Sequence, residues 1–281
     1  MRKLLTLVPV FAWLAPAQAP PLALPDTVTV QANIPYDRYK ETVLNVLQPK
    51  AASKGKRPGL LCIHGGGWVG GTKEQFAPWC LAYVERGFVA VNVEYRLAKA
   101  APAPAAVSDV LKAAQWFRQN AKRYNVDRKR IVVTGASAGG HLALMVGMTP
   151  KSAKLGRPAR VAAVVNFYGI TDVADQLGGP HMQKYAVTWV PEQPRRLELA
   201  RRVSPMTYVR RNVPPVLTIH GDADPTVPYT HGVSLTKALR DAGADAQLIS
   251  VPQGKHGFPK EKMDQLYPQI FEFLKARKIL R

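Results

Sequence analysis

The most informative stretch of the chain is Ile131-Val132-Val133-Thr134-Gly135-Ala136-Ser137-Ala138-Gly139. Its apolar, β-branched start predicts a buried strand, and the residues that follow predict a helix. Glycines stand two residues before and two residues after Ser137, which is typical of a turn too tight for bulky neighbours. Such a turn lifts the serine hydroxyl above the edge of the sheet. A plain Gly/Ser helix cap is the alternative, and both flanking elements argue against it.

Strands and helices are predicted to alternate on both sides of this turn. The predicted strands span residues 27–30, 42–47, 59–63, 88–93, 131–134, 161–167, 216–219 and 246–251, and the predicted helices span residues 76–84, 107–121, 141–148, 233–242 and 263–274. This alternation predicts an α/β fold with a mostly parallel central sheet and helices on both faces. Ligands of such sheets bind at the carboxyl ends of the strands, where Ser137 is expected.

The composition is that of an ordinary globular protein. Of 281 residues, 47% are hydrophobic and 21% are charged. No repeat, low-complexity tract or long linker divides the chain, so residues 18–281 are predicted to form a single domain. Two cysteines, Cys62 and Cys80, are too few for a disulfide framework. They are expected as small core residues or as one disulfide.

Residues 1–17 have the pattern of a secretory signal peptide, with a basic start, a mostly apolar run and small residues after it. Cleavage is expected after Ala17. Ala19 is the competing site, but a cut there would leave Pro20 next to the scissile bond. The apolar run is too short to span a membrane, and no other run is long enough. We therefore expect a secreted or periplasmic protein that is not an integral membrane protein.

The chain is strongly basic. Its formal net charge is +20, and removing residues 1–17 takes away Arg2 and Lys3 and no acid, which leaves +18. A balance of this size can attract anionic polymers or membrane surfaces. The lysines and arginines are scattered, however, and no nucleic-acid-binding signature is present. A solvated basic face is expected, without a nucleic-acid partner.

A serine hydroxyl reacts only when a base takes its proton and a third group orients that base. The candidate bases are His64, His141, His181, His220, His231 and His256. His256 follows the last predicted strand, so it returns to the carboxyl edge of the sheet and is the best base. His64 is expected to hold the glycine loop that follows it, and His141 is expected to point away from the cleft.

The orienting acid is expected after the strand at residues 216–219, where Asp222 and Asp224 both stand. Local spacing does not choose between them. Asp222 also suits a structural role, because an aspartate at a turn can hydrogen-bond its backbone neighbours.

Four motifs, in this order, resemble those of α/β-hydrolases, in particular bacterial carboxylesterases and acetyl (feruloyl) xylan esterases. They are H-G-G-G-W at residues 64–68, G-A-S-A-G at 135–139, H-G-x-x-D-x-x-V-P at 220–228 and H-G-F at 256–258. The resemblance that they carry extends over nearly the whole mature chain. The resemblance implies a catalytic triad of Ser137, His256 and Asp224, and the place of Asp224 within its motif selects it over Asp222.

The glycines after His64 fit the same resemblance. The tetrahedral intermediate of acyl transfer needs backbone N–H donors at about 3 Å, and side chains would block their approach. The resemblance implies that the N–H groups of Gly66, Gly67 and Ala138 form this oxyanion hole, with the Trp68 N–H as an alternative. The Trp68 side chain is also suggested as part of a substrate pocket, stacking on a sugar or an aromatic acyl group, with core packing as the alternative.

Two features depart from the relatives of hormone-sensitive lipase. Residues 20–37 are too short for their N-terminal helical cap, and Lys99 stands where proline often follows the Y-R-L-A motif. The only substantial insertion, residues 174–202, is predicted to form a small lid over the serine, carrying Trp189 and His181. A fairly open site is expected, which disfavours a long-chain lipase.

The sequence therefore predicts a serine ester hydrolase that works through an acyl-enzyme, with no metal and no organic cofactor. The expected substrates are short acyl or feruloyl esters, either small molecules or plant polysaccharide. Three alternatives are disfavoured. A peptidase of the prolyl-oligopeptidase type needs room for a propeller, an arylformamidase would not carry a leader, and a noncatalytic binding protein usually lacks a triad residue. The acyl and alcohol specificity and the oligomeric state stay open.

Overall fold

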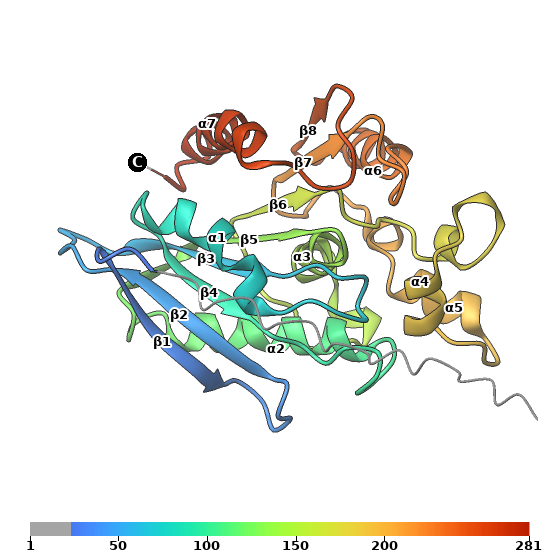
Figure 1. The fold of residues 1–281 in the computed structure, drawn as a ribbon, viewed down its shortest axis with the longest axis horizontal. Helices are drawn as coiled ribbons and strands as arrows, with labels where there is room; N and C mark the ends of the chain where they lie inside the picture. The colour runs from blue at the N-terminus through green and yellow to red at the C-terminus, as the bar shows by residue number, and fades with distance from the viewer. Residues whose placement is uncertain (1–23, 281) are drawn as a thin grey trace, which may run out of the picture.

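The computed structural model describes residues 24–280, and the predicted signal peptide at residues 1–17 lies outside them. Within the described residues the chain forms one eight-stranded sheet in the order β1-β2-β4-β3-β5-β6-β7-β8 (Figure 1). The strands are β1 (Val28–Pro35), β2 (Val43–Pro49), β3 (Arg57–Ile63), β4 (Val89–Val93), β5 (Val126–Ala136), β6 (Ala163–Phe167), β7 (Val216–Gly221) and β8 (Ala246–Val251). The α-helices are α1 (Lys73–Val84), α2 (Ala105–Asn120), α3 (Ala138–Met148), α4 (Lys184–Trp189), α5 (Arg196–Arg202), α6 (Thr230–Asp241) and α7 (Lys260–Ala276).

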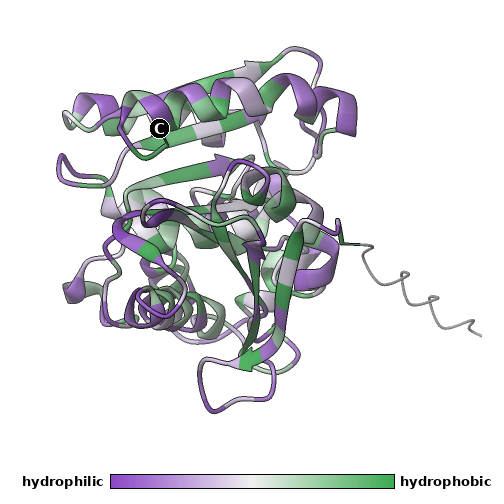
Figure 2. Cartoon of the chain, turned by 90° about the vertical axis from the view of Figure 1, so that its left-hand side faces the viewer, coloured by the Kyte–Doolittle hydropathy of each residue, from purple (hydrophilic) through white to green (hydrophobic). Residues whose placement is uncertain are grey.

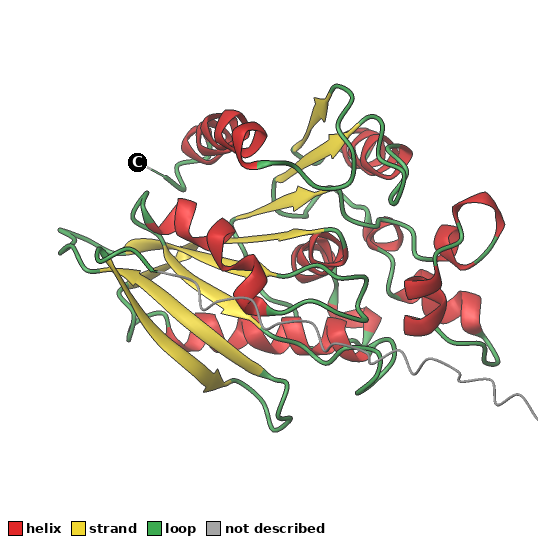
Figure 3. Ribbon diagram, viewed as in Figure 1, coloured by secondary structure: helices red, strands yellow, loops and turns green. Residues whose placement is uncertain are grey.

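The sheet is mostly parallel, as predicted. β2 pairs antiparallel with both β1 and β4 at one edge. From β4 through β3, β5, β6 and β7 to β8, every neighbouring pair is parallel. Helices follow most of these strands along the chain, and Figure 3 shows the yellow strands enclosed by red helices. The predicted α/β-hydrolase architecture is confirmed.

Two apolar layers hold the helices to the sheet. α1 and α7 pack on one face, and α2, α3 and α6 pack on the other. β4 and β6 are buried along their whole length, and their residues are apolar apart from one asparagine in each, Asn92 and Asn166. In Figure 2 the strands are largely green, whereas purple residues lie on the outer sides of the helices. Each fully buried Val or Leu contributes about 1.5–3 kcal/mol to this packing.

Three local predictions are corrected or decided by the structure. β1 continues to Pro35 because its pairing with β2 extends to Pro35 and Val43. α3 begins at Ala138, earlier than expected, because the turn at Ser137 opens directly into the helix. Cys62 and Cys80 are both free and buried, as small core residues.

The insertion at residues 174–202 contains the short 3-10 helices η2 (Ala174–Leu177) and η3 (Gly179–His181), followed by α4 and α5. It lies beyond the carboxyl ends of the strands, at the right of Figure 1. This is the edge of the sheet at which Ser137 follows β5. In the part of the chain described, no helix is long and apolar enough to cross a membrane.

Candidate active site

The turn at Ser137 is as tight as its sequence predicts. Ser137 has φ 57° and ψ −123°, a backbone conformation that non-glycine residues rarely adopt. A Cβ on Gly135 would lie 2.2 Å from the Gly139 carbonyl oxygen, and a Cβ on Gly139 would lie 2.1 Å from the Ile63 carbonyl oxygen. Both glycines are therefore required by sterics. The strained turn leaves the Ser137 side chain partly exposed at the end of β5.

Three residues predicted to act together lie in one hydrogen-bonded row. His256 Nε2 is 2.9 Å from Ser137 Oγ, and His256 Nδ1 is 2.8 Å from Asp224 Oδ2. The Asp224 side chain is fully buried, whereas 21% of the His256 side chain is exposed. The imidazole therefore stands between a buried carboxylate and a hydroxyl that solvent and substrate can reach.

The charge of Asp224 is stabilised by its surroundings. Burial alone would raise the pKa of Asp224, but hydrogen bonds from His220 and His256 outweigh it and hold the pKa below its usual range. The backbone N–H groups of Thr226 and Val227 also donate to Oδ1, at 2.8 and 3.0 Å. A carboxylate held in this way stays ionised at neutral pH and fixes the orientation of His256.

The structure separates the two aspartates that local spacing could not. Asp222 is exposed, and its Oδ1 accepts a hydrogen bond from the Gln253 N–H at 2.7 Å. It joins the loop after β7 to the loop that carries His256. Gly221 and Gly254 pack against each other so closely that a Cβ on Gly221 would lie 2.1 Å from the Gly254 carbonyl oxygen. This contact brings the loops of Asp224 and His256 together.

The glycine run after His64 lies against the serine. A Cβ on Gly65 would lie 3.4 Å from Ser137 Cβ. Gly66 and Gly67 have φ of 107° and 59°, so the loop uses conformations that favour glycine. In the described part of the chain, the N–H groups of Gly66, Gly67 and Trp68 donate to no protein acceptor. Ala138 is the first residue of α3, where an N–H has no partner within its own helix.

His64 holds this loop, as predicted. Its Nδ1 lies 2.7 Å from the Gly65 carbonyl oxygen, and its Nε2 lies 2.9 Å from Glu94 Oε1. The ring stacks on Tyr95 at 4.3 Å between centroids, and the Tyr95 hydroxyl donates to the His64 carbonyl oxygen. The sequence analysis did not identify Glu94. His64 follows β3 and Glu94 follows β4, and no motif around Glu94 indicates that the two side chains meet.

The structure corrects the suggestion that Trp68 lines a substrate pocket. Its side chain is fully buried and stacks on Trp189 at 4.1 Å. Its Nε1–H donates to His141 Nδ1 at 3.1 Å, and His141 Nε2 donates to the Val203 carbonyl oxygen at 2.6 Å. Burial lowers the pKa of His141 to about 4, although the bond to Val203 opposes the shift. Both tryptophans therefore belong to the core beneath the site.

The insertion reaches the glycine loop through a residue that the sequence did not indicate. A Cβ on Gly67 would lie 2.6 Å from Tyr185 Cγ, so the tyrosine packs directly on that glycine. The expected lid residue His181 does not join this contact and bonds to Asp175 instead. That the insertion covers Ser137 stays a prediction. Among residues 24–280, no cluster of His, Cys, Asp or Glu is arranged to hold a metal ion.

The chain is similar to known esterases. It is 29% identical over 239 residues to "Esterase LipQ" of Mycobacterium tuberculosis, covering 81% of this chain and 57% of that protein. The chain spans only 52% to 65% of the length of LipQ and two other mycobacterial relatives.

Two solved structures share its fold over nearly their whole length. A truncated carbohydrate esterase from gut microbiota superposes with a TM-score of 0.78, is 27% identical, and is matched over 90% of this chain and 97% of that one. The esterase Est2 of Thermogutta terrifontis, solved with bound propionate, has a TM-score of 0.75 and 27% identity, with 91% and 96% covered.

The sequence also matches the BD-FAE family over residues 44–239, a range that begins in β2 and ends in α6 and includes Ser137 and Asp224. This range is well over half of the chain. The protein therefore belongs to the BD-FAE family and shares the α/β-hydrolase fold of these esterases.

Proposed function

We propose that the protein is a serine ester hydrolase that cleaves short acyl esters through an acyl-enzyme. The observation that carries this proposal is the row of contacts from Ser137 Oγ to His256 Nε2, at 2.9 Å, and from His256 Nδ1 to Asp224, at 2.8 Å. The N–H groups of Gly66 and Gly67, which have no protein acceptor among residues 24–280, supply the second requirement, donors for a developing oxyanion.

The reaction follows from these positions. Ser137 Oγ attacks the ester carbonyl carbon while His256 Nε2 takes the hydroxyl proton, and the ionised Asp224 stabilises the imidazolium. The negative charge on the former carbonyl oxygen is bound by the N–H groups of Gly66, Gly67 and Ala138. His256 then gives its proton to the leaving alkoxide, which departs as an alcohol. Water repeats the sequence on the acyl-enzyme and releases the acid.

The substrates that we propose are acetyl, other short acyl or feruloyl esters, with plant polysaccharide as one source. Two likenesses support this choice. One structural neighbour is a carbohydrate esterase, and another holds propionate, a three-carbon acid. The small size of the insertion at residues 174–202 also favours short acyl groups.

Export is part of the proposal and rests on residues 1–17. Expression of the whole chain in a bacterial host, followed by N-terminal sequencing of protein from the periplasm or medium, tests it. A mature chain that begins at Gln18 supports cleavage after Ala17, and one that begins at Pro20 supports cleavage after Ala19. Intact chain retained in the cytoplasm would contradict export.

Hydrolysis of a matched series tests the substrate proposal. The mature protein is assayed with 4-nitrophenyl acetate, butyrate, octanoate and ferulate, and with acetylated xylan. Preference for acetate together with acetate release from xylan supports a carbohydrate deacetylase. Preference for ferulate supports a feruloyl esterase. Activity on the small esters with none on xylan contradicts the polysaccharide substrate, and a preference for octanoate contradicts the short-chain assignment.

A further inference from the structure

Tyr185 occupies a position that the mechanism above does not use. It lies in the first turn of α4, within the insertion, and it packs on the glycine loop. A Cβ on Gly67 would lie 2.6 Å from Tyr185 Cγ and 2.7 Å from Tyr185 Cβ. The close contact between Tyr185 and the oxyanion loop therefore requires glycine at position 67, because the Cβ of any other residue would clash with the tyrosine. Its side chain is only partly buried, so some of the ring faces solvent.

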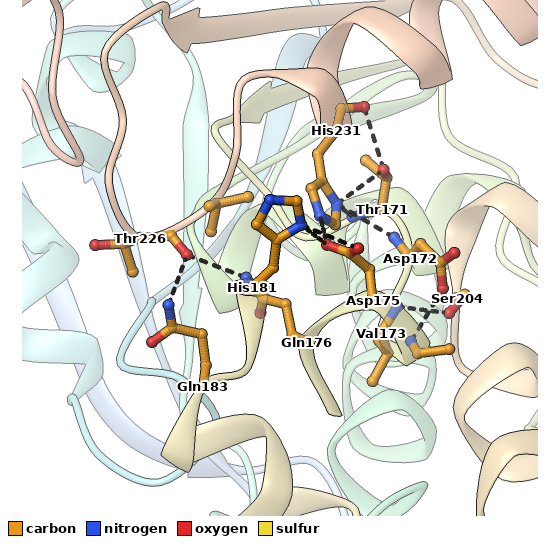
Figure 4. Close-up of polar contacts among 12 residues, drawn as sticks. Thr171, Asp172, Val173, Asp175, Gln176, His181, Gln183, Ser204, Thr226 and His231 are labelled. Atoms are coloured by element: carbon orange, nitrogen blue, oxygen red, sulfur yellow. Dashed lines mark hydrogen bonds and ion pairs between the residues drawn. The ribbon is translucent and has the colours of Figure 1, made fainter. Parts of the chain in front are cut away.

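Hydrogen bonds fix the orientation of this ring. The Tyr185 hydroxyl donates to Gln176 Oε1 at 2.9 Å. Gln176 Nε2 in turn donates to the Thr226 carbonyl oxygen at 3.1 Å, and Gln183 Nε2 donates to the same oxygen at 3.3 Å. Figure 4 shows both glutamines reaching Thr226. Burial raises the pKa of Tyr185 to about 12, so the hydroxyl remains a donor.

Those bonds tie the insertion to the loop of the catalytic acid. The Thr226 N–H donates to Asp224 Oδ1 at 2.8 Å, while the Thr226 carbonyl receives both glutamines. Gln176 is fully buried. A buried amide that loses its partners costs about 1–3 kcal/mol, so the network resists rearrangement. The ring of Tyr185 is thereby fixed relative to the glycine loop on one side and the Asp224 loop on the other.

A second cluster secures the beginning of the insertion. The Asp175 carboxylate lies between two histidines, 3.0 Å from His181 Nδ1 and 3.1 Å from His231 Nε2 (Figure 4). His231 Nδ1 accepts the Thr171 N–H at 3.0 Å, so the Nε2 atom carries the proton donated to Asp175. His231 lies on α6, outside the insertion. This link from the insertion to α6 makes η2 and η3 a fixed base for α4 rather than a free loop.

The position of Tyr185 decides which part of an ester it would meet. His256 must protonate the leaving alcohol, so the alcohol lies on the His256 side, where the ring of Tyr168 packs at 4.7 Å. The aromatic neighbour of Tyr185 is Trp68, at 5.9 Å, and its backbone contact is the oxyanion loop. An acyl group that extends away from His256 toward the oxyanion loop would therefore lie beside Tyr185.

We propose that Tyr185 is the residue that sets acyl-chain length, and that Asp175 positions it through the base of the insertion. This inference rests on the proposed ester hydrolysis. In the short-acyl form of that function, the fixed ring forms a wall that admits an acetyl group and obstructs longer chains. Each methylene that a pocket accepts or rejects changes kcat/KM by about 10- to 200-fold, so one wall residue is enough to set the preference.

Substitution of Tyr185 tests this proposal against the matched 4-nitrophenyl esters. Tyr185→Ala is expected to raise the octanoate-to-acetate ratio of kcat/KM by at least about tenfold, since the wall is removed. Tyr185→Phe keeps the ring and is expected to keep the wild-type ratio. Tyr185→Trp enlarges the wall and is expected to lower the butyrate-to-acetate ratio. Tyr39→Ala, a tyrosine beside Arg96 outside the site, is the matched control and should leave both ratios unchanged.

Asp175→Asn tests the positioning role through the same ratios. Weaker fixing of the insertion is expected to raise the octanoate-to-acetate ratio in the direction of Tyr185→Ala but by a smaller factor. Unchanged ratios in Tyr185→Ala and Tyr185→Trp, with acetate still hydrolysed, would overturn the proposal. Failure of the proposed function is a different result, because wild-type protein would then cleave no ester and a fluorophosphonate would leave Ser137 unlabelled.

Discussion

His256 Nδ1 lies 2.8 Å from Asp224 Oδ2, whereas Asp222, two residues earlier, binds the Gln253 N–H and is exposed. The two aspartates therefore provide a matched pair. Asp224→Asn is expected to reduce kcat on 4-nitrophenyl acetate by about 10⁴-fold, because the imidazole loses the carboxylate that orients and stabilises it. Asp222→Asn should keep kcat near the wild-type value. Equal losses in both variants would show that the aspartates act through loop structure.

The glycine loop should tolerate no side chain at its second glycine. A Cβ on Gly66 would lie 2.1 Å from the Gly70 carbonyl oxygen, and the backbone there has φ 107°. Gly66→Ala is expected to lower kcat by about 100- to 1,000-fold, the usual effect of losing one oxyanion donor. Gly55→Ala is the control, because nothing lies within 4 Å of a Cβ at that position. A wild-type kcat in Gly66→Ala would show that this loop does not form the oxyanion hole.

The buried His141 should make stability depend on pH. Its pKa is about 4 in the folded protein, against 6.5 for a free histidine. Between about pH 6.5 and pH 4, His141 is protonated in the unfolded chain but stays neutral in the folded chain. The contribution of His141 to the free energy of unfolding is therefore fully present above about pH 6.5 and is lost as the pH is lowered toward 4. The shift corresponds to about 3 kcal/mol.

Urea unfolding of wild type and His141→Gln at pH 7 and pH 4 measures this contribution. The variant should be less stable at pH 7, because the Trp68 and Val203 contacts change. The loss of unfolding free energy between the two pH values should be smaller in the variant by about 3 kcal/mol. The same loss in both proteins would show that His141 does not carry the effect.

The stacked pair of Trp68 and Trp189 should contribute to stability and not to substrate contact. Trp189 is fully buried, with its ring centroid 4.1 Å from that of Trp68. Trp189→Ala is expected to lower the free energy of unfolding by about 3–5 kcal/mol, since it removes a large core side chain. Thermal and urea unfolding measure the change. A normal stability with a raised KM would instead place the indole at the substrate.

Much of the fold could be predicted because its signals are local. The strand–turn–helix at Ser137 needs only an apolar run, two glycines and a following helix, and the structure has all three. The alternation of the remaining elements follows from hydrophobic patterning in the same way. The predicted end of β1 and the predicted start of α3 differ from the structure. Pairing with β2 decides where β1 ends, and the geometry of the turn at Ser137 decides where α3 begins.

The site was only partly predictable for a physical reason. The order of four motifs indicated Ser137, Asp224 and His256, but local spacing alone left Asp222 open, and the loop contacts decide between the two. Tyr185 was missed because its contact with Gly67 joins segments far apart in the chain. Trp68 was suggested for the substrate pocket because an aromatic residue after a glycine loop suits either role. Its burial depends on Trp189, which the insertion supplies.

The central claim is that Ser137 is the nucleophile, and turnover of 4-nitrophenyl acetate by Ser137→Ala tests it most directly. The alanine variant keeps the backbone of the turn and removes the hydroxyl that lies 2.9 Å from His256. We predict a loss of kcat of about a million-fold relative to the wild type, with an unchanged circular dichroism spectrum. Turnover by the variant at the wild-type rate would contradict the assignment of the nucleophile and the acyl-enzyme mechanism built on it.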